Sequence, residues 1–197
     1  ITSDGNGALD YAKNNEHDGI VALLERNNSK SKYERIFKND MISKIFKRAN
    51  KKSKYEHLIQ DFKYQILNLE DEKYPIYYHI SINDKNNVED IINNDRNQIK
   101  KQRVDGGISP LLVALLIGNY DIGELLIANE ANVNEEFKDK HTLLHYAVVL
   151  EDKDFCKLLV LNGADIDSKN VDGISPKIIA NKQGNKEIVE IINYFLK

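Results

Sequence analysis

The sequence has little cysteine and no long apolar run, and each of these shortages excludes a class of protein. Its single cysteine, Cys156, cannot form an intramolecular disulfide, so the chain is not a disulfide-stapled scaffold. The longest apolar stretch, residues 111–117, falls far short of the roughly 20 residues that span a bilayer. The first residue is Ile1, and no signal-peptide pattern follows it. We therefore expect a soluble fragment or processed piece of a protein from a reducing, cytoplasmic compartment.

The chain also lacks an excess of charge of one sign. Charged residues make up 30% of its 197 residues, yet the net charge is only −3. This average charge indicates no particular partner. Hydrophobic residues make up 41% of the chain, and a compact fold of this length buries about 70% of the surface that its unfolded chain exposes. The composition therefore allows a real hydrophobic core.

Motifs of catalysis and of metal binding are missing as well. The five histidines show no pair at the spacing of a helical metal motif, and one cysteine is too few to complete a site. The glycines of Gly106-Gly107-Ile108-Ser109 are not followed by the Gly-Lys-Ser/Thr of a phosphate loop. A nucleophile elbow and a specific pair of acidic residues are also absent. We expect no catalytic, metal or cofactor site, no small-molecule substrate and no enzymatic activity.

Four segments of the chain open in the same way. They are Tyr74-Pro75-Ile76-Tyr77, Ser109-Pro110-Leu111-Leu112, Thr142-Leu143-Leu144-His145 and Ser175-Pro176-Lys177-Ile178. Their second residues are 35, 33 and 33 positions apart. A serine or threonine before the first turn can cap free N–H groups, and proline at the first helical position costs no hydrogen bond. The pattern predicts helices that begin near Pro75, Pro110, Leu143 and Pro176.

The same landmarks follow each opening. A glycine or polar residue lies eight positions after the second residue of each tetrad, and an aliphatic pair lies about fifteen positions after it. The first set is Asn83, Gly118, Glu151 and Gly184, and the second is 91–92, 125–126, 158–159 and 191–192. This spacing predicts two antiparallel helices in each unit. Each pair is too short to bury its own apolar face, so neighbouring units must stack to close the core.

The repeat resembles the ankyrin repeat, which has a period of 33 residues and a T-P-L-H-x-A opening. Thr142-Leu143-Leu144-His145-Tyr146-Ala147 matches that opening at every position but the proline. The resemblance implies an all-α, ankyrin-repeat solenoid of stacked helix-turn-helix units with short β-hairpin fingers. It also implies that His145 fixes the start of its helix by hydrogen bonding near the threonine. Cys156 occupies a second-helix position that the family usually fills with valine, which implies a buried apolar role.

The resemblance divides the chain into three parts. Residues 72–197 hold four repeats, and the last is expected to be a C-terminal cap. In that cap, a polar outer face covers three inward isoleucines; the outer residues are Lys182, Lys186, Glu187, Glu190 and Asn193, and the inward ones are Ile188, Ile191 and Ile192. Residues 1–28 align with a degenerate N-terminal repeat. Residues 29–71 contain two amphipathic helical patterns and are either an atypical repeat or a basic helical insertion.

One segment departs from the balanced charge of the rest. Residues 30–54 hold ten basic and two acidic side chains. This surface could bind nucleic acid, an anionic membrane or an acidic protein, or it could be an ordinary solvated face. The candidate polyanion-binding residues are Lys44, Lys47, Arg48, Lys51, Lys52 and Lys54.

The resemblance also indicates where a partner protein would bind. Ankyrin proteins usually bind on the concave face, which is built from finger tips and from the late positions of each first helix. The candidate partner-binding residues are Asp105, Ile108, Leu116, Ile117, Lys138, His141, Val149, Leu150, Asp172 and Ile174. Four of them, Leu116, Ile117, Val149 and Leu150, are aliphatic at positions that are often polar, so they either form an exposed binding patch or lie buried in a different helix register.

We therefore expect a protein–protein interaction scaffold that binds its partner through the concave groove. Polyanion binding through residues 30–54 is the alternative. The abundance of lysine and asparagine suits an AT-rich genome such as that of a parasite, a virus or an intracellular bacterium. By that association, the chain could be a host-directed effector in the host cytosol, or an adaptor.

Overall fold

The computed structural model describes residues 75–100 and 107–194 of the chain. Four first helices begin where the sequence predicts them: α4 (Pro75–Ser81), α7 (Pro110–Ile117), α9 (Leu143–Val149) and α11 (Pro176–Gln183). Each is followed by a second helix: α5 (Lys85–Asn94), α8 (Tyr120–Ala128), α10 (Lys153–Leu161) and α12 (Lys186–Tyr194). A short helix, α6 (Asn97–Lys100), follows α5. The expectations for residues 1–71 lie outside the described residues.

The openings of the repeats act as helix caps. The hydroxyl oxygen of Ser109 accepts a hydrogen bond from the Leu112 amide, and Pro110 takes the first helical position. Ser175 and Pro176 repeat this arrangement at the start of α11. The second helices are capped by aspartate or asparagine instead of serine. The side chains of Asp84, Asn119 and Asp152 each accept a hydrogen bond from the backbone amide three residues later. The caps explain why these helices begin at equivalent places in their repeats.

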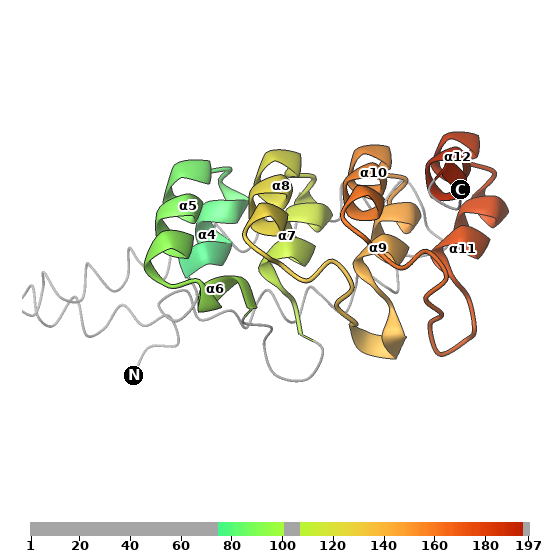
Figure 1. Ribbon diagram of the computed structural model, residues 1–197, viewed down its shortest axis with the longest axis horizontal. Helices are drawn as coiled ribbons and strands as arrows, with labels where there is room; N and C mark the ends of the chain where they lie inside the picture. Colours follow the sequence, from blue (N-terminus) through green and yellow to red (C-terminus); the bar gives the residue numbers. More distant parts are fainter. Residues whose placement is uncertain (1–74, 101–106, 195–197) are drawn as a thin grey trace, which may run out of the picture. The chain divides into compact units, whose positions relative to one another are not determined.

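The helices form two layers, as Figure 1 shows. The first helices α4, α7, α9 and α11 contact one another in order, and the second helices α5, α8, α10 and α12 lie beside them in the same order. The core lies between the layers and between neighbouring repeats. In α7, every residue from Pro110 to Leu116 is buried, because α4, α8 and α9 all pack against it. None of the described helices is long and apolar enough to cross a membrane.

The turn between the two helices of each repeat is left-handed. Asn83, Gly118, Glu151 and Gly184 have φ of 60°, 78°, 52° and 70°. These are the positions eight residues after the start of each first helix, where the sequence shows a glycine or a polar residue. Only glycine adopts this conformation without steric cost. The glycine or polar residue that recurs at this position in the sequence therefore reflects the positive φ that the turn requires.

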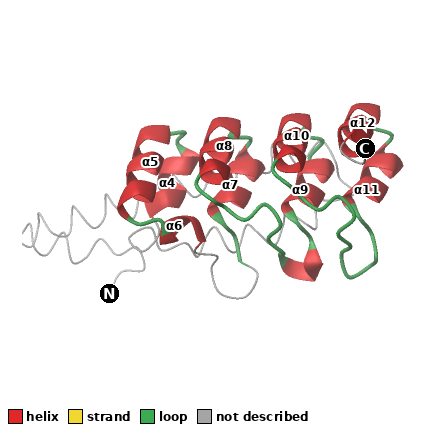
Figure 2. Ribbon diagram, in the orientation of Figure 1, coloured by secondary structure: helices red, strands yellow, loops and turns green. Residues whose placement is uncertain are grey.

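The two fingers that the structure describes in full, before α9 and before α11, are compact loops rather than extended hairpins (Figure 2). Glu136 and Thr142 form a single antiparallel β-bridge, and a 3-10 turn, η2 (Lys138–Lys140), closes the finger between them. The next finger turns back through a hydrogen bond from the Asn170 amide to the Ile174 carbonyl. Within the described residues, the predicted β-hairpins are thus reduced to this one bridge.

His145 ties two repeats together. Its Nδ1 accepts a hydrogen bond from the Thr142 amide at 3.0 Å, which fixes the start of α9 as expected. Its Nε2–H donates to the Ile174 carbonyl of the next finger at 3.0 Å. Tyr77 occupies the same position in the first described repeat, and its hydroxyl donates to the Ile108 carbonyl at 2.8 Å. Two chemically different side chains therefore make the same bond between neighbouring repeats.

A second histidine extends this network. Nε2 of His141 accepts a hydrogen bond from the Asn170 side-chain amide at 3.1 Å, and its Nδ1–H donates to the Lys138 carbonyl. The Val171 amide donates to the Asp139 carbonyl nearby, so the two fingers are joined by backbone as well.

Burial of the imidazole lowers the pKa of His145 to about 4, although its bond to the Ile174 carbonyl acts in the opposite direction. His145 therefore stays neutral at ordinary pH.

The second layer has its own matched contact. Gly123 in α8 lies against the ring of Phe155 in α10, and a Cβ added at Gly123 would lie 2.7 Å from two ring atoms. The ring of Tyr120 packs edge-on against the same phenylalanine.

Cys156, one repeat after Gly123, is buried, as expected. Because the thiol is buried, its pKa is raised well above the ordinary value, so it packs as an apolar group.

The last described repeat agrees with the expected division into inward and outward residues except at Ile191. Ile188 and Ile192 are buried, and Ile191 is half-buried. The polar residues expected on the outside, Lys182, Lys186, Glu187, Glu190 and Asn193, are all exposed.

A pair of equivalent positions tests the cost of the left-handed backbone. Glu130 after α8 has a φ of 71°, and Gly163 stands 33 residues later, after α10, with a φ of 84°. Replacing Glu130 by glycine should stabilise the protein by about 0.5–1 kcal/mol, because the backbone strain of a side chain there is removed. Gly163→Ala should destabilise it by a similar amount, since no atom lies within 4 Å of the added Cβ and only strain changes. Urea unfolding measures both, and destabilisation by Glu130→Gly would contradict this reading.

The buried His145 predicts a loss of stability in mild acid. The folded-state pKa of about 4 lies below the ordinary value of 6.5, so unfolding takes up a proton between these two pH values. Stability should therefore fall as the pH drops through this window, by roughly 2–3 kcal/mol between pH 7 and pH 4.5. Glutamine at this position can still accept from Thr142 but does not titrate. His145→Gln should flatten the pH dependence of urea midpoints, and an unchanged slope would assign the effect to other groups.

Candidate functional site

The residues seven positions after the start of each first helix form a line across the first layer. They are Ile82, Ile117, Leu150 and Gln183. Ile82 is 46% exposed, and the other three are half-buried. Three successive repeats thus present an aliphatic side chain at the same place, and the fourth presents an amide. The Gln183 amide donates to the Val149 carbonyl of the preceding repeat, so this line runs along the boundaries between repeats.

The sequence analysis predicted two pairs of neighbouring residues, at the ends of α7 and α9, as partner-binding residues. In the structure, the two members of each pair differ in burial. Ile117 and Leu150 are partly exposed, as a residue that contacts a partner must be, and their role in binding stays a prediction. Leu116 and Val149 are buried at 0% and 1% exposure, so the expected partial exposure is wrong for these two. The reason is helical geometry, because successive residues point about 100° apart. When the second member of each pair reaches the surface, the first turns into the core.

The finger residues divide in the same manner. Lys138 and Asp172 are exposed, and Ile174 is half-buried. Ile108 and His141 are buried, so their assignment to an open surface is wrong. Both are held by the contacts between repeats, since the Ile108 carbonyl accepts from Tyr77 and the His141 ring bonds Asn170. Asp105 lies outside the described residues.

Ile82 was missed by the sequence analysis. It lies seven residues after Pro75, as Ile117 lies seven residues after Pro110. That offset was the available signal, and it was applied only to the three later repeats. With Ile82 included, the line extends over every first helix that the structure describes.

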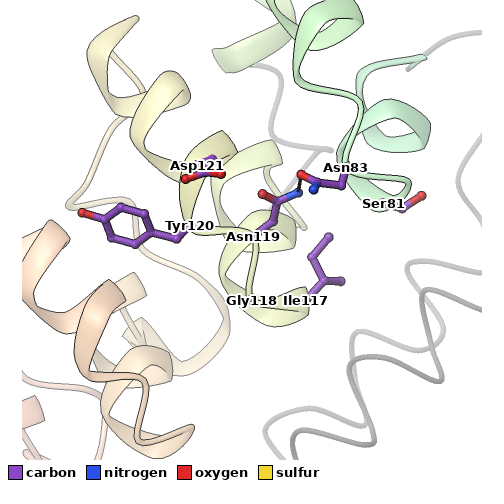
Figure 3. Close-up of a pocket in the computed structure, with 7 residues that line it drawn as sticks. All are labelled: Ser81, Asn83, Ile117, Gly118, Asn119, Tyr120 and Asp121. Carbon is purple, nitrogen blue, oxygen red and sulfur yellow. Dashed lines mark hydrogen bonds between the residues drawn. The ribbon is translucent and has the colours of Figure 1, made fainter.

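A hollow opens beside this line between the first two described repeats (Figure 3). It has a volume of about 370 Å³ and is lined by Ser81, Asn83, Ile117, Gly118, Asn119, Tyr120 and Asp121. The Asn119 amide donates to the Asn83 side-chain oxygen at 2.9 Å and to the Ile80 carbonyl at 3.2 Å, which fixes the polar wall. Figure 3 shows Ile117 and the Tyr120 ring pointing to opposite sides of this turn. The hollow therefore combines an aliphatic side chain with amide and hydroxyl groups.

The site offers binding groups rather than reactive ones. Within residues 75–100 and 107–194, no group of three or more His, Cys, Asp or Glu side chains could hold a metal ion. Both nitrogens of His145 are engaged in hydrogen bonds, and burial raises the pKa of the Cys156 thiol, so neither side chain is an available base or nucleophile. The alternative polyanion-binding residues between Lys44 and Lys54 lie outside the described residues, and that surface stays a prediction.

Comparison with known proteins gives both sequence and structural relatives. A family described as "Ankyrin repeats (3 copies)" matches residues 56–170, which is more than half of the chain. Alpha-latrocrustotoxin-Lt1a of Latrodectus tredecimguttatus is 33% identical over 94 residues, covering 47% of this chain and 6% of the toxin. An ankyrin repeat protein of Acanthamoeba polyphaga mimivirus is 29% identical over 102 residues, covering 51% of this chain and 13% of the viral protein. The chain thus spans only a small part of the length of these relatives.

One of the structural neighbours has the same architecture. The crystal structure of the ankyrin repeat domain of Bcl-3, a member of the IkappaB protein family, superposes with a TM-score of 0.55 at 22% sequence identity. The alignment covers 60% of this chain and 50% of that one. At this identity the likeness concerns the fold alone. Together with the capped helix pairs, the left-handed turns and the stacked layers, the sequence match shows that this chain belongs to the ankyrin-repeat family.

Proposed function

We propose that this chain binds another protein through the groove formed by its first helices and fingers. Ankyrin repeats in general are protein–protein interaction domains, and they are typically binding scaffolds without enzymatic activity. One observation supports the use of the groove here. Ile82, Ile117 and Leu150 are aliphatic and partly exposed at the same register in three successive repeats. Side chains that serve only the core have no need of this exposed position.

The groove favours a partner with an apolar stripe and polar edges. The aliphatic side chains of this line provide apolar surface area. Removing such surface from water on binding stabilises a complex by about 25 cal/mol for each Å² buried. Lys138 and Asp172, both exposed on the fingers, supply charges of both signs at the rim. Apolar anchors surrounded by a polar rim are the usual composition of a protein-binding surface. A partner segment that lies along the first helices would cover the line and meet the fingers at its edge.

The nature of the whole protein remains part of the proposal. A host-directed effector or adaptor in the cytosol agrees with the composition and with the likeness to a viral ankyrin protein. Polyanion binding by residues 30–54 is the alternative. Salt separates the two, because binding to a nucleic-acid polyanion releases counterions and weakens steeply as salt rises, whereas apolar binding does not.

Substitutions along the groove test the proposal. The partner is first captured and identified with the 197-residue chain, and its dissociation constant is then measured for single variants. Ile117→Asp and Leu150→Asp should each weaken binding by about tenfold or more, because buried apolar anchors dominate interface energies. Each should cost only about 1 kcal/mol of stability, since the side chains are half-buried.

Two further variants serve as controls. Ala128→Asp introduces the same charge at an exposed position of α8, in the second layer and away from the first helices, and should leave the affinity unchanged. Val149→Asp should unfold the protein, because it buries an unpaired carboxylate. Equal affinity of the Ile117 and Leu150 variants with the native chain would refute the groove as the binding surface.

A further inference from the structure

The finger that precedes α11 keeps its shape through hydrogen bonds within itself. This α11 finger consists of residues 170–174 (Figure 1). The side-chain oxygen of Asn170 accepts from the amides of Asp172 and Ile174 at 3.1 and 2.9 Å. The Asn170 amide donates to the Ile174 carbonyl, and the Gly173 amide donates to the Asn170 carbonyl. Because these bonds lie within the finger, it moves as one piece when its contacts to the preceding repeat break.

A pair of histidines attaches the α11 finger to the preceding repeat. Within the described residues three hydrogen bonds make this attachment, and one of them is a backbone bond to η2. In the other two, the Asn170 side-chain amide donates to Nε2 of His141 at 3.1 Å, and Nε2–H of His145 donates to the Ile174 carbonyl at 3.0 Å. The two rings pack edge-on with their centroids 5.3 Å apart, and both are buried. The attachment of the finger therefore depends on two adjacent imidazoles.

The hydrogen-bond partners fix both imidazoles in the neutral form. Since the Asn170 oxygen already accepts from two amides, its NH2 group faces Nε2 of His141, which is therefore an unprotonated acceptor. Nδ1 of His145 faces the Thr142 amide, which can only donate, so this nitrogen is unprotonated as well. A proton bound at either nitrogen would set a donor against a donor and place a charge in a buried site. The closed finger therefore binds such a proton more weakly than an open finger, in which the rings meet water.

The groups around the pair disfavour a proton on His145. Burial lowers its pKa to about 4 against the opposing effect of the Ile174 carbonyl, and the nearby His141 lowers it as well. The buried Glu135 carboxylate bonds Ser109. The other titratable side chains on the elements packed against the pair are the exposed Glu136, Lys138, Asp139, Lys140, Lys169 and Asp172, the half-buried Lys177 and the buried Tyr146, whose ring contacts His141.

We propose that His141 and His145 form a proton-sensitive latch, which holds the α11 finger closed while both rings are neutral and releases it in mild acid. The consequence for binding rests on the proposed function, because Asp172 and Ile174 on this finger are candidate partner-binding residues at the edge of the groove. Release moves both residues away from the first helices and lowers the affinity for the partner. At the first described boundary the equivalent bond comes from the Tyr77 phenol, which keeps its proton in acid, so the latch acts on the α11 finger alone.

Amide hydrogen exchange of the full chain, followed by NMR, tests the latch. The reporter is the Val171 amide, whose bond to the Asp139 carbonyl breaks when the finger opens. With His145 at its ordinary pKa of 6.5 in the open finger and at about 4 in the closed one, the protection factor of Val171 should fall about 30-fold between pH 7.5 and pH 5. Low urea concentrations should not change this exchange, because a local opening exposes little surface. A protection factor that does not depend on pH would overturn the proposal.

Three glutamine substitutions separate the latch from other titrating groups. His141→Gln and His145→Gln each keep a side-chain acceptor but do not titrate, so the variant that combines them should show equal protection of Val171 at both pH values. The matched control His79→Gln removes a histidine that pairs with Asp84 and should keep the full effect. A fall that persists in the double variant would refute the role of the pair. If that variant does not fold, the imidazole signals of the native chain decide, because loss of protection must then follow the protonation of His145.

The consequence for binding is measured with the partner that the native chain captures. Its dissociation constant should rise several-fold more for the native chain than for the double variant when the pH is lowered over the same range, because only the native finger is released. Equal pH dependence of the two would overturn the regulatory role. Ile117→Asp tests the groove at neutral pH, and the exchange of Val171 needs no partner. Failure of the proposed function and failure of the latch are therefore seen in different experiments.

Discussion

The fold depends on the burial of each first helix by its two neighbours. α7 shows the constraint most clearly, because seven of its eight residues are buried and the apolar side chains surround the helix. An isolated pair of helices eight or nine residues long could not cover such a surface, and helices of this length are unstable alone in water. The stability of every repeat is therefore shared with the next one. Caps and turns set where the helices start, but stacking determines whether they form.

Hydrogen bonds between repeats fix the register of this stacking. Apolar contacts tolerate small shifts, whereas the bonds from Tyr77 to Ile108 and from His145 to Ile174 hold only at one distance. The Ser109 hydroxyl, which also donates to the Glu135 carboxylate, adds a link within the second described repeat. Because a carbonyl in each of two fingers is tied to the preceding first helix, the finger position follows the helix position. The first helices and the fingers are consequently held together by the same bonds that align the core.

Sequence reasoning recovered the period and the start of every described first helix, since these follow from local chemistry such as a serine cap and a proline at the first position. It could not decide between Leu116 and Ile117, or between Val149 and Leu150. All four are aliphatic, and the choice depends on the rotation of α7 and α9 against their neighbours. Ile108 and His141 were misplaced for a related reason, because both lie at contacts between adjacent repeats, where the Ile108 carbonyl accepts from Tyr77 and the His141 ring accepts from Asn170.

The contact between Gly123 and Phe155 limits how this array can be rearranged. A large ring in α10 fits because the preceding second helix has no side chain at the facing position. The equivalent positions in the other described repeats hold Val88, Cys156 and Val189, so none of them offers the same space. If the repeat that contains α10 were duplicated or moved, its Phe155 ring would face one of these side chains instead of the hydrogen of Gly123. The order of these two units is thus encoded in their shapes, and recombination that separates them would have to change both residues together.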